Sequence, residues 1–174
     1  MKELKKPGII VAEGYDYEII KKAYRPQDDL SLLVTLKANG TIEKTVIGSL
    51  AESLTVDRHD AADWNRLKEI FASNTLQMVS FTITEKGYSI TSPDGAFRAD
   101  VKADFEAGPE NADSYIGKLA ALCYWRYTQG AAPLALVSMD NCSHNGDKLF
   151  AAVDAYAKAW TENGKGREGL LRVH

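Results

Sequence analysis

The most informative segment of the sequence is residues 134–146, which read LALVSMDNCSHNG. Its first four residues are apolar and mostly branched, which is typical of a buried parallel strand. The strand is expected to end at Ser138, and the polar pair Asp140-Asn141 follows it. Asn145-Gly146 then indicates a turn, and a helical pattern begins at Asp147. Because ligands of open α/β sheets bind beyond the carboxyl ends of the strands, these polar side chains are candidates for substrate chemistry.

A second segment, residues 78–88, reads MVSFTITEKGY and has a similar organisation. An apolar strand is expected over Gln77 to Ile83, and Glu85 follows it. Both segments resemble signatures of the long-chain polyol and hexuronate dehydrogenases, the family of mannitol dehydrogenase, fructuronate reductase and tagaturonate reductase. Residues 138–146 resemble its Ser-x-Asp-Asn-x-x-x-Asn-Gly signature, and residues 78–88 resemble its V-S-x-T-x-T-E-x-G-Y pattern. The resemblance covers roughly Gly8 to Trp160.

The resemblance implies an NAD-dependent enzyme with a Rossmann-like fold, which exchanges hydride between a nicotinamide and a sugar carbonyl or polyol. The substrate pair is left open among fructuronate and mannonate, tagaturonate and altronate, and fructose and mannitol. Family members begin with a Gly-rich turn that holds the dinucleotide pyrophosphate, whereas the early glycines here, Gly8 and Gly14, lack the G-x-G-x-x-G spacing. Family members also continue into a large helical domain that carries the catalytic Lys. We therefore expect residues 1–174 to be a partial dinucleotide-binding domain, cut at both ends.

The rest of the sequence alternates between strand and helix patterns. Strands are expected at Gly8–Glu13, Ser31–Lys37 and Thr41–Ile47, the last two joined by a hairpin at Asn39-Gly40. Helices are expected at Tyr15–Tyr24, at Asp60–Ala72, from a cap at Asp113 or Ser114 to Tyr127, and at Asp147–Trp160. Residues 89–111 are expected to form a long active-site loop, and the tail 161–174 to be poorly packed. The alternation predicts an α/β fold with a mixed, mainly parallel sheet flanked by helices.

Composition excludes several classes of protein. A net charge of −3 over 174 residues provides no basic patch for nucleic acid. No apolar run approaches the roughly 20 residues that a membrane-spanning helix needs. The first residues, MKELKK, lack the apolar core of a signal peptide, and the two cysteines suit free thiols in a reducing compartment. These features together predict a cytoplasmic protein with no nucleic-acid or membrane partner.

Asn141 is the strongest candidate for a catalytic residue. During carbonyl reduction, negative charge develops on the carbonyl oxygen, and a fixed amide N–H can stabilise it without competing for the proton. The resemblance implies that Asn141 helps bind and polarise the substrate oxygen. The alternative is that Asn141 only caps the following helix, as Asn often does.

Three further residues of the two motifs are candidates. Asp140 could act in catalysis, orient Asn141, or hold a backbone amide. Glu85 lies in a motif that, by the resemblance, lines the nicotinamide and substrate pocket, where a carboxylate could control proton access to the catalytic Lys. The alternative for Glu85 is a solvated loop acid. The same motif makes Thr84 a candidate contact of the cofactor.

Glu13 is a candidate for cofactor binding because it ends an apolar strand. In dinucleotide folds, an acid near the end of the second strand binds the ribose hydroxyls and selects NAD over NADP. If Gly8–Glu13 is that strand, either Glu13 or Asp16 has this role. A metal site is not expected, since His144 and Cys142 lack further ligands at a suitable spacing.

Two functions of different classes remain open from the sequence. The first is a fragment of a dehydrogenase, whose partners are a sugar acid or polyol substrate and a C-terminal helical domain. The second is a non-catalytic α/β module that binds a dinucleotide or a protein partner. The chain alone is also expected to form a homo-oligomer, through the sheet edge at Gly8–Glu13 or the helix containing Trp64.

Overall fold

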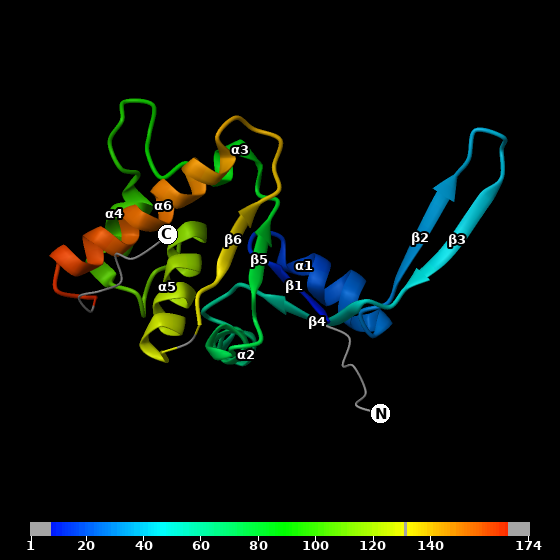
Figure 1. Ribbon diagram of the computed structural model, residues 1–174, viewed down its shortest axis with the longest axis horizontal. Helices are drawn as coiled ribbons and strands as arrows, with labels where there is room; N and C mark the ends of the chain where they lie inside the picture. The colour runs from blue at the N-terminus through cyan, green and yellow to red at the C-terminus, as the bar shows by residue number, and fades with distance from the viewer. Residues whose placement is uncertain (1–7, 131, 167–174) are drawn as a thin grey trace. The chain divides into compact units, whose positions relative to one another are not determined.

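The computed structural model describes residues 8–130 and 132–166. The chain divides into two compact units, Met1–Trp64 and Asn65–His174. Its strands pair as two parallel ladders and one antiparallel ladder, and helices precede or follow them (Figure 1). The expectation of an α/β fold with parallel strands flanked by helices is confirmed, whereas the single mixed sheet was wrong: the described strands form three separate two-stranded sheets, and the hairpin pairs with neither parallel ladder.

The parallel ladder of the first unit joins β1 (Ile9–Glu13) to β4 (Leu50–Thr55). The strand expected at Gly8–Glu13 is therefore present. No element was expected at residues 48–59, because Glu52 and Ser53 interrupt the apolar pattern of β4. The structure nevertheless buries the last three residues of β4, including Ser53 and Thr55. Pairing with a strand about forty residues away, and not local composition, makes this segment a strand.

The segment after β1 is helical but not uniformly α-helical. It comprises α1 (Tyr17–Ile19), a π-helical turn (Ile20–Tyr24) and a 3-10 turn (Arg25–Gln27). The helix expected at Tyr15–Tyr24 therefore begins two residues later, at Tyr17, and gives way after Tyr24 to a separate 3-10 turn. Pro26 stands at the start of the 3-10 turn, where its missing N–H would have no intrahelical partner.

The antiparallel ladder is the hairpin of β2 (Ser31–Leu36) and β3 (Ile42–Ile47). Its turn contains Gly40 with φ of +81°, which explains the Asn39-Gly40 signal in the sequence. Many apolar side chains of the hairpin are exposed: Leu32, Leu33, Val34, Leu36, Ile42 and Val46.

A half-buried ion pair within the first unit holds the start of α2 (Ala61–Ala72). The Arg25 guanidinium lies 2.6 Å from Asp63 Oδ1 and also donates to the carbonyl oxygen of Ser53 at 3.1 Å. Asp63 Oδ2 accepts from both the backbone N–H and the hydroxyl of Thr55, at 2.8 and 2.7 Å. One carboxylate therefore connects β4, α2 and the 3-10 turn.

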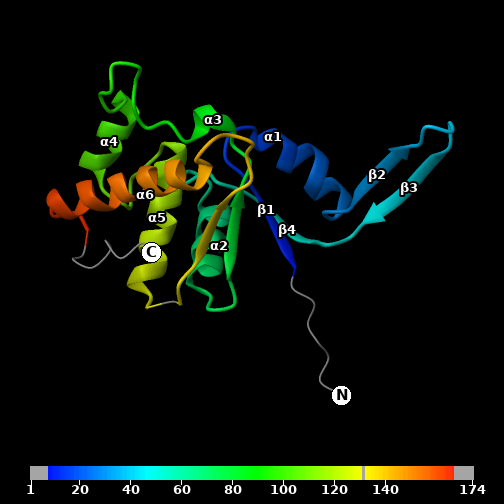
Figure 2. The same cartoon turned by 45° about the horizontal axis from the view of Figure 1, so that its top comes forward.

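The second unit contains the parallel ladder of β5 (Met78–Phe81) and β6 (Ala135–Ser138). Its helices are α3 (Thr84–Gly87), α4 (Ala99–Ala107), α5 (Tyr115–Thr128) and α6 (Asn145–Glu162). Figure 2 shows α6 lying across α4 and α5, and both pairs of helices are in contact. The core of this unit consists of apolar side chains from the three helices: Val101, Phe105, Ile116, Leu119, Leu122, Leu149, Val153, Tyr156 and Trp160.

Residues 89–111 are not the long loop that the sequence suggested. They contain α4, preceded by a turn at Gly95 and an isolated bridge between Thr91 and Phe97. The loop was expected because glycines and prolines, which are typical of turns, lie at both ends of the segment. Val101 and Phe105, four residues apart, form one buried helical face, and this face makes the segment a helix.

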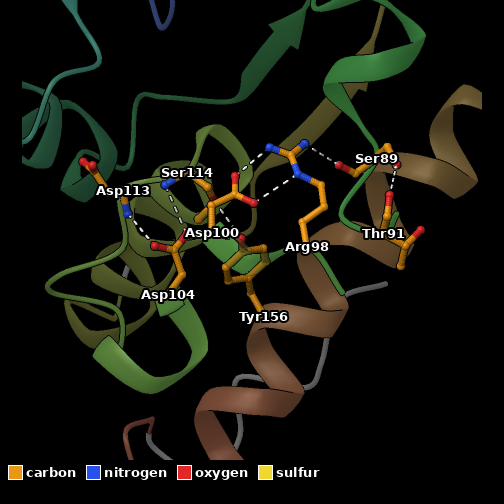
Figure 3. Close-up of polar contacts among 9 residues, drawn as sticks. Ser89, Thr91, Arg98, Asp100, Asp104, Asp113, Ser114 and Tyr156 are labelled. Atoms are coloured by element: carbon orange, nitrogen blue, oxygen red, sulfur yellow. Dashed lines mark hydrogen bonds and ion pairs between the residues drawn. The ribbon is translucent and has the colours of Figure 1, made fainter. Parts of the chain in front are cut away.

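A buried carboxylate organises the N-terminus of α5 (Figure 3). Asp104 accepts hydrogen bonds from the backbone N–H groups of Asp113 and Ser114, at 2.8 and 3.1 Å, and from the Tyr156 hydroxyl at 3.2 Å. Ser114 caps α5 by accepting from Gly117 N at 3.1 Å, which confirms one of the two expected caps. Asp104 is only 4% exposed, so α4, α5 and α6 meet at a buried carboxyl group whose two oxygens both accept hydrogen bonds.

Arg126 of α5 donates hydrogen bonds to the carbonyl oxygens at the C-terminus of α2. The Arg126 side chain is buried, with the residue only 4% exposed. Its guanidinium donates to four backbone carbonyl oxygens, those of Phe71, Ser73, Leu76 and Ala132, at 2.6 to 3.2 Å. Carbonyls at the end of a helix lack intrahelical donors, and they carry partial negative charge. Arg126 therefore supplies the donors that the end of α2 needs.

The tail was expected to be poorly packed from Thr161 onward. Its first residues are hydrogen-bonded, although most of them are exposed: Thr161 and Glu162 complete α6, and the N–H groups of Lys165 and Gly166 both donate to the carbonyl oxygen of Trp160. The remainder of that expectation falls on residues 167–174, which lie outside the described residues. Among the described helices, none combines the length and apolar character required to cross a bilayer.

Candidate active site

The candidate site lies at the carboxyl ends of β5 and β6. Phe81 is paired with Ser138 at the end of the ladder, and Met139 N donates to Phe81 O at 2.8 Å just beyond it. The two segments singled out in the sequence therefore leave the same edge of one parallel ladder. This is the edge at which α/β sheets bind their ligands.

The Asp140 carboxylate connects the two loops. Oδ2 accepts from Ile83 N at 2.8 Å and from the Tyr88 hydroxyl at 2.5 Å, and Oδ1 accepts from Thr84 N at 3.0 Å. Thr84 has φ of +62°, a left-handed conformation that is unfavourable for a β-branched residue. The hydrogen bonds that the Ile83 and Thr84 amides donate to Asp140 hold the loop in this conformation. Asp140 therefore holds backbone amides, which is one of the roles considered for it from the sequence.

The protonation states of Asp140 and Tyr88 follow from this geometry. The hydrogen bond from Tyr88 lowers the pKa of Asp140, and the Ile83 and Thr84 amides lower it further. Burial raises the pKa of Tyr88 to about 12, and the adjacent Asp140 carboxylate contributes in the same direction. At neutral pH, Asp140 is therefore an anion that accepts, and Tyr88 is a neutral phenol that donates. Because the Tyr88 proton is committed to Asp140, Ser138 Oγ at 2.6 Å acts as the donor to Tyr88.

Asn141 follows Asp140 and is exposed. Within the described residues its carboxamide makes no hydrogen bond. The N-cap of α6 is His144, which makes no side-chain capping bond. Helix capping by Asn141, the alternative from the sequence, is therefore not what the structure shows. The carboxamide remains available to a ligand.

The backbone that carries Asn141 is held from two sides. Asp140 O accepts from Asn145 Nδ2 of α6 at 2.7 Å and from Cys142 N at 3.0 Å. The carboxylate of the same residue is bound to Ile83, Thr84 and Tyr88, as described above. The peptide leading into Asn141 is therefore fixed, whereas its side chain is not.

Glu85 belongs to the short helix α3, and its carboxylate is ion-paired with Lys148 of α6 at 2.5 Å. The hydrogen bond and charge of Lys148 lower the pKa of Glu85, and Glu85 in turn raises the pKa of Lys148. Both side chains are more than a third exposed. Neither Lys148 nor Tyr88 was assigned a role from the sequence; Tyr88 stands inside the quoted motif, but no local signal indicated Lys148.

Glu13 belongs to the other unit and ends β1. Its Oε1 accepts from Tyr15 N at 2.8 Å and from Asp16 N at 3.3 Å, which orders the turn after the strand. Asp16 caps α1 by accepting from Glu18 N. Among the described residues Glu13 Oε2 accepts no hydrogen bond. Each of the two acids considered for the ribose therefore uses one carboxylate oxygen locally, Glu13 in the turn after β1 and Asp16 as the cap of α1, and Glu13 is the one that ends the strand.

Residues 8–130 and 132–166 contain no cluster of three or more His, Cys, Asp or Glu arranged for a metal ion. Cys123 and Cys142 are free thiols. His144 is exposed, and its ring lies 3.2 Å from the Asp147 carboxylate.

No family model matches the chain. Individual relatives do. The chain is 45% identical to the D-mannonate oxidoreductase of Thermotoga maritima over 157 residues, which are 90% of this chain and 29% of that protein. It is 33% identical to the polyol:NADP oxidoreductase of Gluconobacter oxydans over 144 residues, 80% of this chain and 29% of that protein.

Two solved structures resemble the fold. A D-sorbitol dehydrogenase in substrate-free form matches with a TM-score of 0.71 and 30% identity, over 87% of this chain and 32% of that chain. The Pseudomonas fluorescens mannitol 2-dehydrogenase, in a ternary complex with NAD and D-mannitol, matches with a TM-score of 0.68 and 28% identity, over 83% of this chain and 29% of that chain. The chain thus spans less than a third of the length of these relatives. It belongs to the family of long-chain polyol and hexuronate dehydrogenases.

Proposed function

We propose that this chain contributes the cofactor-side and substrate-polarising part of an NAD-dependent oxidoreductase that acts on a sugar acid or polyol. The observation that carries the proposal is the unengaged carboxamide of Asn141 at the carboxyl end of β6, on a backbone fixed by Asp140. The D-mannonate oxidoreductase, at 45% identity, favours the mannonate and fructuronate pair over the tagaturonate and fructose alternatives.

In the proposed reaction, the nicotinamide supplies the hydride when it is bound. The Asn141 carboxamide donates an N–H to the substrate carbonyl oxygen and stabilises the charge that develops there. Asp140 stays ionised and holds the loop. Glu85, paired with Lys148, places a carboxylate next to the same loops, where it can orient a substrate hydroxyl. Thr84 remains a candidate cofactor contact, since it lies on the loop held by Asp140.

The fit of the chain to NAD is partial. Glu13 places a free carboxylate oxygen at the end of a parallel strand, which suits a ribose diol and disfavours a 2′-phosphate. The sequence contains no G-x-G-x-x-G turn for the pyrophosphate. We therefore propose that residues 1–174 are part of a dinucleotide-binding domain, and that further polypeptide supplies the phosphate-binding turn and the proton donor.

This proposal also defines the partners. Besides the substrate and NAD, they are the helical domain of the complete enzyme and, for the chain alone, further copies of itself. We propose the cytoplasm as the compartment, because the chemistry uses NAD and the thiols are free.

A substrate panel tests the function. The complete polypeptide is assayed with NADH and NADPH against fructuronate, tagaturonate and fructose, and the 174-residue chain is assayed in parallel. Turnover is expected for the complete polypeptide with NADH and fructuronate, and none for the chain alone. Nucleotide binding without turnover on any sugar would instead support the non-catalytic module.

A further inference from the structure

We propose that Tyr88 is a positioning residue for the Asn141 carboxamide and acts through Asp140. The inference rests on the proposed role of Asn141 and adds a residue on a different loop to that site. Tyr88 is separated from Asp140 by 52 residues in the sequence, yet their side chains are 2.5 Å apart.

The first step of the argument is the direction of the hydrogen bonds. A phenol has one proton, and the Asp140 carboxylate is its strongest acceptor in contact. Tyr88 therefore donates to Asp140 and accepts from Ser138 Oγ, which is 2.6 Å away. The resulting series of hydrogen bonds runs from Ser138, at the end of β6, through Tyr88 to Asp140, in the loop that follows β6. Hydrogen bonds arranged in such a chain polarise and strengthen one another.

The second step is the burial of Tyr88. The residue is only 3% exposed, so its ring is held by packing and its hydroxyl has a fixed position. An exposed tyrosine could follow a moving loop, whereas a buried one restrains the loop. Tyr88 therefore provides the rigid support for the Asp140 carboxylate.

The third step connects Asp140 to Asn141. The carboxylate of Asp140 is bound by Tyr88 and two amides, and its carbonyl oxygen accepts from Asn145 and Cys142. Among these hydrogen bonds to Asp140, the bond from Tyr88 is the one that a buried side chain donates, and Tyr88→Phe removes it. The loop then turns about its remaining bonds, and the Asn141 carboxamide moves with it. Catalytic donors tolerate displacements well below 1 Å, so a small shift is costly.

The test is a double-mutant cycle in the complete polypeptide. Tyr88→Phe removes one hydroxyl and keeps the ring. We expect kcat to fall about 10- to 100-fold with an unchanged KM for NADH. In the Asn141→Ala background, Tyr88→Phe should cause no further loss, because it acts through Asn141. Tyr124→Phe is the matched control. The Tyr124 ring is half-buried in the same unit, and its hydroxyl makes no hydrogen bond in the described residues. The activity of this variant should therefore match that of the wild type.

Three outcomes decide between the explanations. Wild-type kcat in Tyr88→Phe, or an equal loss in both backgrounds, would overturn the positioning role and leave the proposed function intact. If Tyr88→Phe does not fold, Ser138→Ala, which removes the donor to Tyr88, is measured in the same cycle. If the wild type itself turns over no sugar, the proposed function fails. NMR of the Asn141 side-chain amide then still tests positioning, since Tyr88→Phe should shift and broaden it and Tyr124→Phe should not.

Discussion

Gly117 and Asp104 are so close that a Cβ atom added to Gly117 would lie 2.2 Å from Asp104 Oδ2. The carboxylate cannot retreat, because it is buried and already accepts hydrogen bonds from two backbone amides and from Tyr156. The absence of a side chain at Gly117 is therefore what lets α5 begin against Asp104. The position needs Gly for space and not for an unusual φ.

Gly117→Ala is therefore expected to destabilise the protein by about 1–3 kcal/mol, as overpacking does in a rigid site. Gly146→Ala is the matched control, since Gly146 is also in the first turn of a helix but has open space where a Cβ would lie. That control should stabilise the protein by about 0.5–1 kcal/mol. Urea unfolding measures both, and effects of the same sign would contradict the geometry.

Arg126→Met should destabilise the protein by about 3 kcal/mol or more, because it leaves four carbonyl oxygens without their donor. Arg126→Lys keeps the charge but lacks the planar fork, so an intermediate loss is expected. The control Arg98→Met removes an exposed pair with Asp100 and an exposed bond to the Ser89 carbonyl oxygen, which together contribute about 1 kcal/mol or less. Thermal unfolding of the three variants would refute the capping role if Arg126→Met behaved like Arg98→Met.

Asp63 should make stability dependent on acid pH. Burial raises the pKa of Asp63, but the hydrogen bonds from Thr55 and the Arg25 charge outweigh it and hold the pKa below its usual range. A depressed folded-state pKa contributes stability that is fully present above the unfolded value, roughly pH 4, and is lost as the pH falls through the folded value.

The Asp63→Asn variant should accordingly lose about 1–3 kcal/mol at pH 7 and show a smaller further loss toward pH 2 than wild type. Glu106→Gln provides the control, because Glu106 is exposed and its carboxylate accepts no hydrogen bond in the described residues. Denaturant midpoints from pH 7 to pH 2 measure the effect, and parallel curves for Asp63→Asn and wild type would exclude it.

Lys148→Met should raise the pKa of Glu85 toward its ordinary value, because Lys148 supplies both the hydrogen bond and the charge that lower it. Carbon-13 NMR titration of the Glu85 carboxyl gives the pKa directly. Lys86→Met serves as the control, since Lys86 is adjacent to Glu85 but forms no ion pair in the described residues. An unchanged titration in Lys148→Met would mean that the pair does not persist in solution.

Asn141→Ala should lower the hydride-transfer rate of the complete enzyme by on the order of 100-fold or more, with little change in cofactor affinity. Asn141→Asp should lose more, because a carboxylate cannot donate and repels the developing negative charge. Asn111→Ala, an exposed Asn in the same unit, should retain the wild-type rate. Single-turnover kinetics measure the step, and a loss confined to cofactor binding would remove Asn141 from the oxygen site.

Elements with strong local signals, and the identity of the site motifs, could be predicted from the amino-acid sequence. The hairpin at Asn39-Gly40, a helix cap at Asp113 or Ser114, and the strand at Leu134–Ser138 follow from turn, capping and apolar patterns within a few residues. The two motifs also identified the family, because their residue types recur in order.

Features that depend on contacts between distant residues could not be predicted, because they form only when the chain folds. Strand β4 forms because β1 pairs with it, and α4 forms because Val101 and Phe105 have a core to enter. The bond from Tyr88 to Asp140 and the pair of Glu85 with Lys148 connect residues 52 and 63 positions apart. No local pattern encodes such distances, since propensity and periodicity act over a few residues, whereas hydrogen bonds and burial depend on where the folded chain brings side chains together.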